Sequence, residues 1–245
     1  MTTTSHVRMH WGRAWHALRE LLRDADDTAK AIEVDFAIGA RDFERSFQRF
    51  AASPSGAGLL AERPSLAAAL CDRAALESMR PDSLGRAYLE YLDRTGFRPT
   101  GLVELQDDVR RVWEGRGWLP PLAPERRWFL HRLTLIHDLT HVVTGHATDP
   151  AGEATLLAFT QGQQGGRANG LLTAGASFEM VRRTGLSWLP WVVSAWRRGR
   201  RAVSLLELPW EELIALRLST VRRLARLESL NPSRAGDREP CHTTQ

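Results

Sequence analysis

Apolar side chains recur every three or four positions along almost the whole chain, a spacing that is typical of amphipathic helices rather than strands. Near the start, Trp11, Trp15 and Leu18 follow this spacing. In the first half of the chain the pattern predicts helices over 9–22, 29–38, 42–50, 65–71, 73–79 and 84–95. Serine, proline and glycine at 53–58 predict a loop, and 115–124 reads as a linker within the fold.

The second half continues the pattern, and its helix ends carry capping residues. A helix is predicted over 125–144, with Gly145 as its C-cap. Asp149 then supplies an N-cap oxygen, and Pro150 suits the first position of the next helix. The remaining elements that we expect are a glycine-rich turn over 162–170, an apolar helix over 171–181 and a last helix over 209–226.

The chain therefore reads as an all-α protein, a single multi-helix domain over 9–230 with disordered tails at 1–8 and 231–245. Its 245 residues allow a sizeable core, and 43% hydrophobic and 25% charged residues are ordinary for a globular protein. No apolar run approaches the roughly 20 residues that span a bilayer. The N-terminus also lacks the apolar core of a signal peptide, so we expect a cytoplasmic protein.

Two cysteines are too few for a disulfide framework or a zinc–thiolate cluster. Cys71 lies in an apolar helical pattern, which predicts a small core residue. Cys241 lies in the polar tail, where we assign it no function.

The charge balance is modestly positive, with a formal net charge of +4 and a pI of about 9.8. Lys30 is the only lysine, and arginine in place of lysine indicates a GC-rich bacterial genome rather than a functional choice. The densest basic cluster, Arg197–Arg201, follows a stretch that contains Trp188, Trp191 and Trp196. Tryptophan beside arginine fits a lipid surface better than a nucleic acid, so no nucleic-acid partner is expected. The alternative is that these tryptophans pack the core.

The candidate chemistry lies in His137-Asp138-Leu139-Thr140-His141, followed after eleven intervening residues by Glu153. At about 100° per residue, the side chains of His137, Asp138 and His141 share one face of a helix. Glu153 falls on the next helix, which can fold back and aim its carboxylate at the same point. Imidazole nitrogens and carboxylate oxygens suit zinc or another first-row divalent ion. The pattern thus predicts a preformed metal site.

Other interpretations compete with this one. Metalloproteases also use histidines at i and i+4, but no glutamate stands between the two here as the base. A metal-dependent phosphohydrolase would need further ligands, of which the sequence offers no clear set. Two partly exposed histidines on an ordinary helix account for HxxxH equally well, although Asp138 and Glu153 weigh against that reading. Of the flanking histidines, His131 lies on nearly the opposite face. His146 either supports the site from behind the ligands or, as we rather expect, caps the helix or faces solvent.

The spacing HDxxH-x11-E resembles the signature of the Coq4 family, which takes part in ubiquinone (coenzyme Q) biosynthesis. The block IHDLTHVVTGHATDPAGEATLLAFTQGQ, over 136–163, is similar to the family's core throughout. Upstream, PDSLGRAYLEYLDRTGFRP over 81–99 resembles the family's SLG-x-AY element, and 195–227 resembles its closing element. The resemblance covers roughly 11–227 and argues against a chance cluster of ligand-type residues.

The resemblance implies an all-helical fold and a divalent metal, usually taken as zinc, on His137, Asp138, His141 and Glu153. It also implies peripheral association with the inner membrane and a site for a prenylated quinone precursor near the metal. A homodimer and other quinone-biosynthesis proteins are the protein partners that it implies.

Two functions are compatible with the resemblance. The first is an enzyme that carries out oxidative decarboxylation at ring carbon C1 of a polyprenylated 4-hydroxybenzoate, with the metal as a Lewis acid. A hydroxylated product needs an oxidant, and a redox metal would fit that chemistry better than zinc. The second is a non-catalytic organiser of a quinone-biosynthetic complex with a structural metal, in which 171–181 and 188–193 hold the prenyl tail or rest on the membrane.

Overall fold

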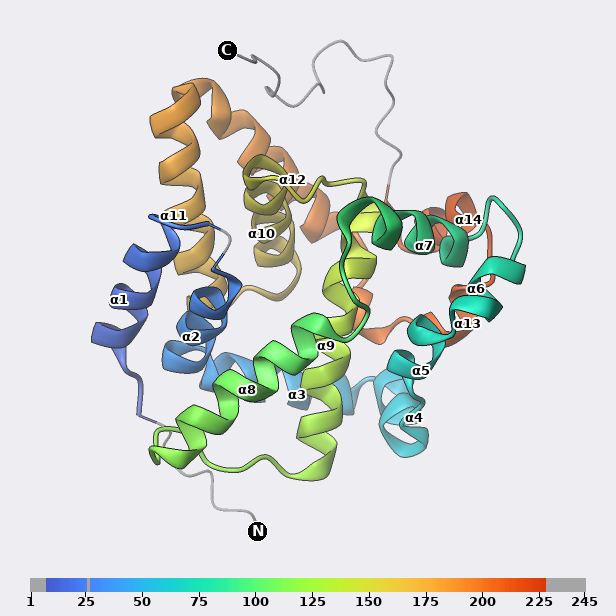
Figure 1. Cartoon of the computed structure of the whole chain (residues 1–245), viewed down its shortest axis with the longest axis horizontal. Coiled ribbons are helices and arrows are strands. Elements are labelled where there is room, and N and C mark those ends of the chain that lie inside the picture. The colour runs from blue at the N-terminus through green and yellow to red at the C-terminus, as the bar shows by residue number, and fades with distance from the viewer. Residues whose placement is uncertain (1–7, 26, 228–245) are drawn as a thin grey trace.

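The computed structural model describes residues 8–25 and 27–227, and every regular element in these ranges is a helix (Figure 1). The all-α prediction is therefore confirmed. The predicted tail at 231–245 lies outside the described residues, as do seven of the eight residues of the N-terminal one. None of the described helices is long and apolar enough to cross a membrane.

Eight helices make up the first half of the described chain: α1 (Trp11–Leu21), α2 (Thr28–Ile38), α3 (Ala40–Ala52), α4 (Pro54–Glu62), α5 (Leu66–Cys71), α6 (Arg73–Ser78), α7 (Leu84–Thr95) and α8 (Gly101–Gly115). The second half contains α9 (Pro124–Thr144), α10 (Pro150–Gln164), α11 (Arg167–Thr184), η1 (Leu186–Trp188), α12 (Leu189–Arg201), η2 (Leu205–Glu207), α13 (Trp210–Leu213) and α14 (Leu218–Leu224).

Helix α9 runs through the middle of the molecule (Figure 1). It contacts α5, α7, α8, α14 and η2, while α10 packs mainly against α11 and α12. On α9, the ring of Phe129 lies 4.9 Å from that of Phe50 and 5.5 Å from that of Phe47. This aromatic packing anchors the first half of α9, the helix that carries the candidate site.

The expected loop at 53–58 is wrong, because these residues begin α4. The hydroxyl of Ser53 accepts a hydrogen bond from the backbone N–H of Gly56 at 3.0 Å. Pro54 occupies the first helical position, where its missing N–H costs nothing. Serine, proline and glycine here form a helix start rather than a loop.

The expected turn at 162–170 is also wrong in extent. Helix α10 continues through Gly162 to Gln164, and the chain turns only at Gly165 and Gly166, which both have positive φ. Because α10 is longer than expected, Gly162 lies within this helix and packs against the backbone of Trp196 on α12.

The single helix that we expected over 209–226 is broken between α13 and α14. The carbonyls of Ile214 and Leu216 accept hydrogen bonds at 2.8 Å from the N–H groups of Gly85 and Leu84, respectively. These donors stand at the start of α7, where an α-helix has no internal acceptors for them. The chain therefore leaves the helical path to cap α7.

One expectation about burial is wrong: Cys71 is exposed and is not a core residue. On α1, Trp11 and Trp15 are 52% and 58% exposed, and the buried face is formed by Ala14, Ala17 and Leu18. The tryptophan-rich stretch divides: Trp188 is fully buried, as the packing alternative held, whereas Trp196 remains exposed.

Candidate metal centre

Two helix ends set the geometry of the candidate site. Helix α9 ends at Gly145, which adopts the left-handed conformation at φ 79°, as the sequence predicts for a C-cap. Helix α10 begins after Asp149, whose carboxylate accepts a hydrogen bond from the N–H of Gly152 at 2.7 Å. The chain thus reverses within a few residues and brings the first turn of α10 back towards α9.

Gly152 is where this reversal is tightest. A Cβ atom at this position would lie 2.1 Å from the carbonyl oxygen of Ala147, closer than any real contact. The connection over 145–149 therefore crosses directly over the first turn of α10. That approach turns the neighbouring Glu153 towards α9.

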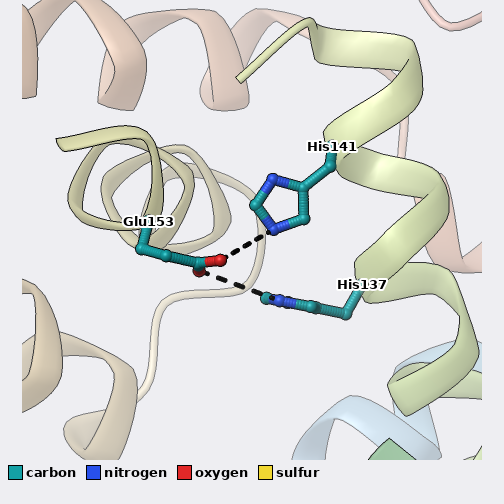
Figure 2. A group of neighbouring side chains, drawn as sticks. All are labelled: His137, His141 and Glu153. Atoms are coloured by element: carbon teal, nitrogen blue, oxygen red, sulfur yellow. Dashed lines mark ion pairs between the residues drawn. The ribbon is translucent and has the colours of Figure 1, made fainter. Parts of the chain in front are cut away.

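Three of the four predicted ligand residues converge. Nε2 of His141 lies 3.2 Å from Oε1 of Glu153, and Nε2 of His137 lies 3.9 Å from Oε2 of the same carboxylate. Figure 2 shows both rings pointing from α9 towards the carboxylate on α10. One donor atom from each residue falls within 4.8 Å of the other two. The spacing along the chain does bring these side chains together, and their role as metal ligands stays a prediction.

The hydrogen bond on the far side of the His141 ring fixes its tautomer. Nδ1 lies 3.1 Å from the carbonyl oxygen of His146. A carbonyl oxygen only accepts, so Nδ1 carries the hydrogen. In the neutral ring, Nε2 is then an acceptor that faces a carboxylate, which is also an acceptor. Such a pair needs a proton or a metal cation between its members.

The charges around the triad respond to this contact. Burial lowers the pKa of His141, but the contact with the charged carboxylate of Glu153 raises it by more, and the net direction is upward. Burial raises the pKa of Glu153, while His141 and His137 lower it by more. Desolvation lowers the pKa of His137 and keeps that ring neutral, which is the form that binds metals.

The donor set fits a divalent metal. Two ligand atoms of a tetrahedral zinc ion at about 2.1 Å are about 3.4 Å apart, so small side-chain rotations would bring the three donor atoms to such spacing. Nε2 of His141 is buried and has no hydrogen bond of good geometry, as expected of an atom reserved for a cation. The side chains of His137 and Glu153 are 37% and 40% exposed, which leaves an open side. An open coordination position is what separates catalytic zinc sites from structural ones.

Asp138, the fourth predicted ligand, is not part of this group. Its buried carboxylate accepts a 3.4 Å hydrogen bond from the hydroxyl of Tyr91 on α7. Burial raises the pKa of Asp138. The ring of Tyr91 also stacks on that of His141, with centroids 5.9 Å apart. Tyr91 therefore links Asp138 to the triad, and direct ligation by Asp138 remains a prediction.

The surroundings of the site include His146, for which the preferred sequence interpretation is wrong and the supporting role is the better description. The ring of His146 neither caps α9 nor faces solvent; its Nδ1 lies 2.9 Å from the hydroxyl of Thr155 on α10. Burial lowers its pKa to about 3, so the ring stays neutral. His131, which was expected to lie away from the site, contacts Asp107 on α8 at 3.0 Å. The spacing of Tyr91 with Tyr88 indicates a shared face of α7, but no signal in the sequence shows that this face meets the site.

The arrangement is chemically suited to hold a Lewis acid beside an open position. Two neutral imidazoles and one carboxylate would leave a bound divalent ion with net positive charge. Such an ion can polarise a carboxylate or phenolate oxygen of a substrate. No other group of three metal-ligating side chains appears among the described residues.

The comparisons with known proteins identify the family of the chain. A sequence profile described as "Coenzyme Q (ubiquinone) biosynthesis protein Coq4" matches residues 4–113 and 121–231. The ubiquinone biosynthesis protein COQ4, mitochondrial, of Yarrowia lipolytica is 28% identical over 174 residues, which are 69% of this chain and 60% of that protein. Its homolog 1 in Culex quinquefasciatus is 27% identical over 182 residues, 73% of this chain and 60% of that protein. The chain thus spans about 60% of the length of these two mitochondrial relatives.

A solved structure shares the fold. It comes from Nostoc punctiforme, its description names ubiquinone biosynthesis, and it superposes with a TM-score of 0.63 at 15% sequence identity. The superposition covers 90% of this chain and all of the other. At that identity the likeness concerns the fold alone. Because the family profile spans nearly the whole sequence, including both helices of the candidate metal centre, the chain belongs to the Coq4 family.

Proposed function

We propose that this protein acts in ubiquinone biosynthesis as a metal-dependent enzyme on a polyprenylated benzoate-type intermediate, at a membrane surface. The reaction that suits the site is oxidative decarboxylation at ring carbon C1. The observation that carries the proposal is the pair of acceptors, Nε2 of His141 and Oε1 of Glu153, held 3.2 Å apart beside the open ring of His137. Family membership supports the pathway, and the class of substrate is the one that the family resemblance implies.

The metal would be held by His137, His141 and Glu153, with Asp138 as the further ligand that the family resemblance implies. When bound, a divalent ion supplies Lewis acidity towards the carboxylate or phenolate oxygens of the substrate. The family resemblance favours zinc, whereas a redox-active ion suits the electron balance better. The chemistry of the three donors accepts either ion.

The protein's own groups would orient the substrate and control protons. His146 holds the ring of His141 through its backbone carbonyl. Tyr91 covers the same ring and holds Asp138. Replacing the C1 carboxyl group by a hydroxyl group removes two electrons from the ring, and molecular oxygen or another two-electron acceptor has to receive them. In this proposal the triad would bind the substrate oxygens through the metal, and the electron acceptor would be a separate co-substrate.

A second candidate function is a non-catalytic organiser that binds a prenyl lipid around a structural metal. The exposed apolar side chains of η1 and α12 favour it, because they offer a surface for lipid away from the triad. In either function we expect other quinone-biosynthesis proteins and a second copy of the chain as partners. The location that fits both is the cytoplasmic face of a bacterial inner membrane.

The test combines metal content with turnover. Purified protein is subjected to elemental analysis and native mass spectrometry, and turnover of a C1-carboxylated prenylphenol is followed under air. We expect bound metal and loss of carbon dioxide from the native protein, and neither from His141→Ala. The matched control is His131→Ala, a histidine on the same helix that contacts Asp107 instead of the triad. Full quinone production by metal-free His141→Ala would contradict the enzymatic proposal, and retained lipid without turnover would favour the organiser.

A further inference from the structure

Helix α12 is anchored on one face only. Gly199 lies against the backbone of Phe159, and Gly162 of α10 lies against the backbone of Trp196, so that the two helices touch directly. A Cβ at Gly199 would meet the carbonyl oxygen of Phe159 at 2.0 Å. Helices α10 and α12 make the most extensive contact between elements in the described structure. The orientation of α12 is therefore fixed, and so is the direction of its outer face.

The first half of that outer face is apolar. Its exposed large apolar side chains, with one from the preceding η1 turn, are Leu186 (73%), Leu189 (44%), Val193 (42%) and Trp196 (37%). At about 100° per residue, Leu189, Val193 and Trp196 fall within about 60° of one another around the helix. Exposed apolar residues scattered singly need no explanation, but an aligned stripe marks an interaction surface.

The second half of the same face is basic. Arg197, Arg200 and Arg201 line an open hollow of about 310 Å³ together with Trp196. The guanidinium of Arg200 lies 5.0 Å from the centre of the Trp196 ring. No carboxylate in the described part of the chain forms an ion pair with these three arginines.

The neighbouring arginines of α11 differ from these three. Nε of Arg182 lies 3.0 Å and Nε of Arg183 lies 2.8 Å from the carboxylate of Glu179, which offsets part of their charge. Among the described residues no carboxylate does this for the three arginines of α12, so their positive charge is concentrated beside the apolar stripe.

We propose that the outer face of η1 and α12, from Leu186 to Arg201, docks on a membrane that contains anionic phospholipid. The apolar side chains would enter the interfacial region, and the three arginines would hold lipid phosphates in the hollow beside Trp196. The apolar stripe suits the acyl chains of such a membrane. The three arginines, which have no carboxylate partner among the described residues, suit its charged headgroups. A nucleic acid would match only the basic half.

This proposal rests on the membrane-bound substrate of the proposed function, and the structure connects the two. Arg198, on the inner side of α12, donates a hydrogen bond at 3.2 Å to the carbonyl of Thr144, at the end of α9. Helix α10, on which α12 lies, also carries Glu153. The docking face is thus one helix away from the triad, so a docked protein would hold its candidate metal centre close to the membrane surface.

Vesicle cosedimentation of the full-length protein tests the proposal. The vesicles are phosphatidylcholine alone or phosphatidylcholine with phosphatidylglycerol, at low and at physiological salt. We expect binding only to the phosphatidylglycerol vesicles, weakened by salt. Arg197→Ala/Arg200→Ala/Arg201→Ala should lower that affinity about a hundredfold, because each basic residue near such a surface contributes severalfold. Leu189→Ser/Val193→Ser should lower it as well.

The control is Arg182→Ala/Arg183→Ala, which removes two positive charges from α11, where both arginines pair with Glu179. It should bind vesicles nearly as well as the native protein. Equal binding by the triple arginine variant and the native protein overturns the proposal. So does binding of inorganic phosphate at these arginines without any vesicle binding.

Metal content and turnover of detergent-dispersed substrate are measured on the same samples. A docking variant that keeps both but loses vesicle binding supports the docking face. A native protein that binds anionic vesicles but has neither metal nor turnover supports docking and contradicts the proposed function.

Discussion

Nε2 of His141 on α9 lies 3.2 Å from Oε1 of Glu153 on α10, although both atoms accept hydrogen bonds when the ring is neutral. The tautomer that produces this conflict follows from the carbonyl of His146, which takes the hydrogen on Nδ1. The backbone carbonyl of His146 thus leaves Nε2 of His141 without a hydrogen in the neutral ring, so that this nitrogen can bind a cation. Metal-binding histidines commonly donate their other ring N–H in this way.

Glu153→Gln tests the conflict directly. The amide can donate to Nε2 of His141, so the metal-free variant should be at least as stable as the metal-free native protein. It should, however, lose the stabilisation by metal, which for a ligand at a hundred times its Kd is about 2.7 kcal/mol. Thermal unfolding with and without added zinc measures both effects. Glu90→Gln, an exposed residue on α7, is the control and should respond to zinc as the native protein does.

Tyr91→Phe should weaken metal binding without unfolding the protein. The variant keeps the ring on His141 but removes the hydroxyl that donates to Asp138 at 3.4 Å. Loss of such an outer contact typically lowers metal affinity about 10- to 100-fold. Tyr88→Phe is the control, because the hydroxyl of Tyr88 is buried without a hydrogen-bond partner in the described structure. Equal affinities of the two variants, measured by competition with a chelator, would show that Tyr91 serves only to pack.

Gly152→Ala should disturb the site through the backbone. The added Cβ would lie 2.1 Å from the carbonyl oxygen of Ala147, so the connection over 145–149 has to move and Glu153 moves with it. Overpacking of this kind costs about 1–3 kcal/mol, and we expect metal content to fall as well. Gly58→Ala on α4 is the control, since its Cβ would meet nothing within 4 Å. That variant should stabilise the protein by about 0.5–1 kcal/mol in urea unfolding.

Local signals explain what could be predicted from the sequence. The caps at Gly145 and Asp149 depend on neighbouring residues only, and both lie where the sequence places them. The convergence of His137 and His141 with Glu153 follows from helix periodicity and a short reversal between two helices. Ser53 is an equally local N-cap signal, but the serine, proline and glycine residues at 53–58 led to the prediction of a loop instead of a helix start.

Contacts between distant segments explain what could not be predicted. The helix expected over 209–226 breaks because the carbonyls of Ile214 and Leu216 accept hydrogen bonds from the start of α7, more than a hundred residues away in the chain. The ring of His146 is buried by Thr155 on the next helix. Tyr91 reaches Asp138 only because α7 packs on α9. Periodicity within one segment contains no information on these partners.

The buried pair of Arg132 and Glu211 offers a test of how α9 is held independently of the metal. Nη1 of Arg132 lies 2.5 Å from the carboxylate, and the side chain of Arg132 is only 2% exposed. Its other terminal nitrogen donates to the carbonyl of Leu208. Glu211→Ala would leave the guanidinium buried and unpaired, which costs about 3–5 kcal/mol.

We therefore expect Glu211→Ala to lower the free energy of unfolding in urea by that amount and to lower the urea midpoint accordingly. Glu77→Ala is the control, because Glu77 pairs with Arg73 on the surface, where both side chains are at least half exposed. Exposed pairs of this kind contribute little, so the control should unfold as the native protein does. If the two variants lost the same stability, the pair on α9 would be no stronger than a surface ion pair, and the position of α9 would depend on its apolar packing alone.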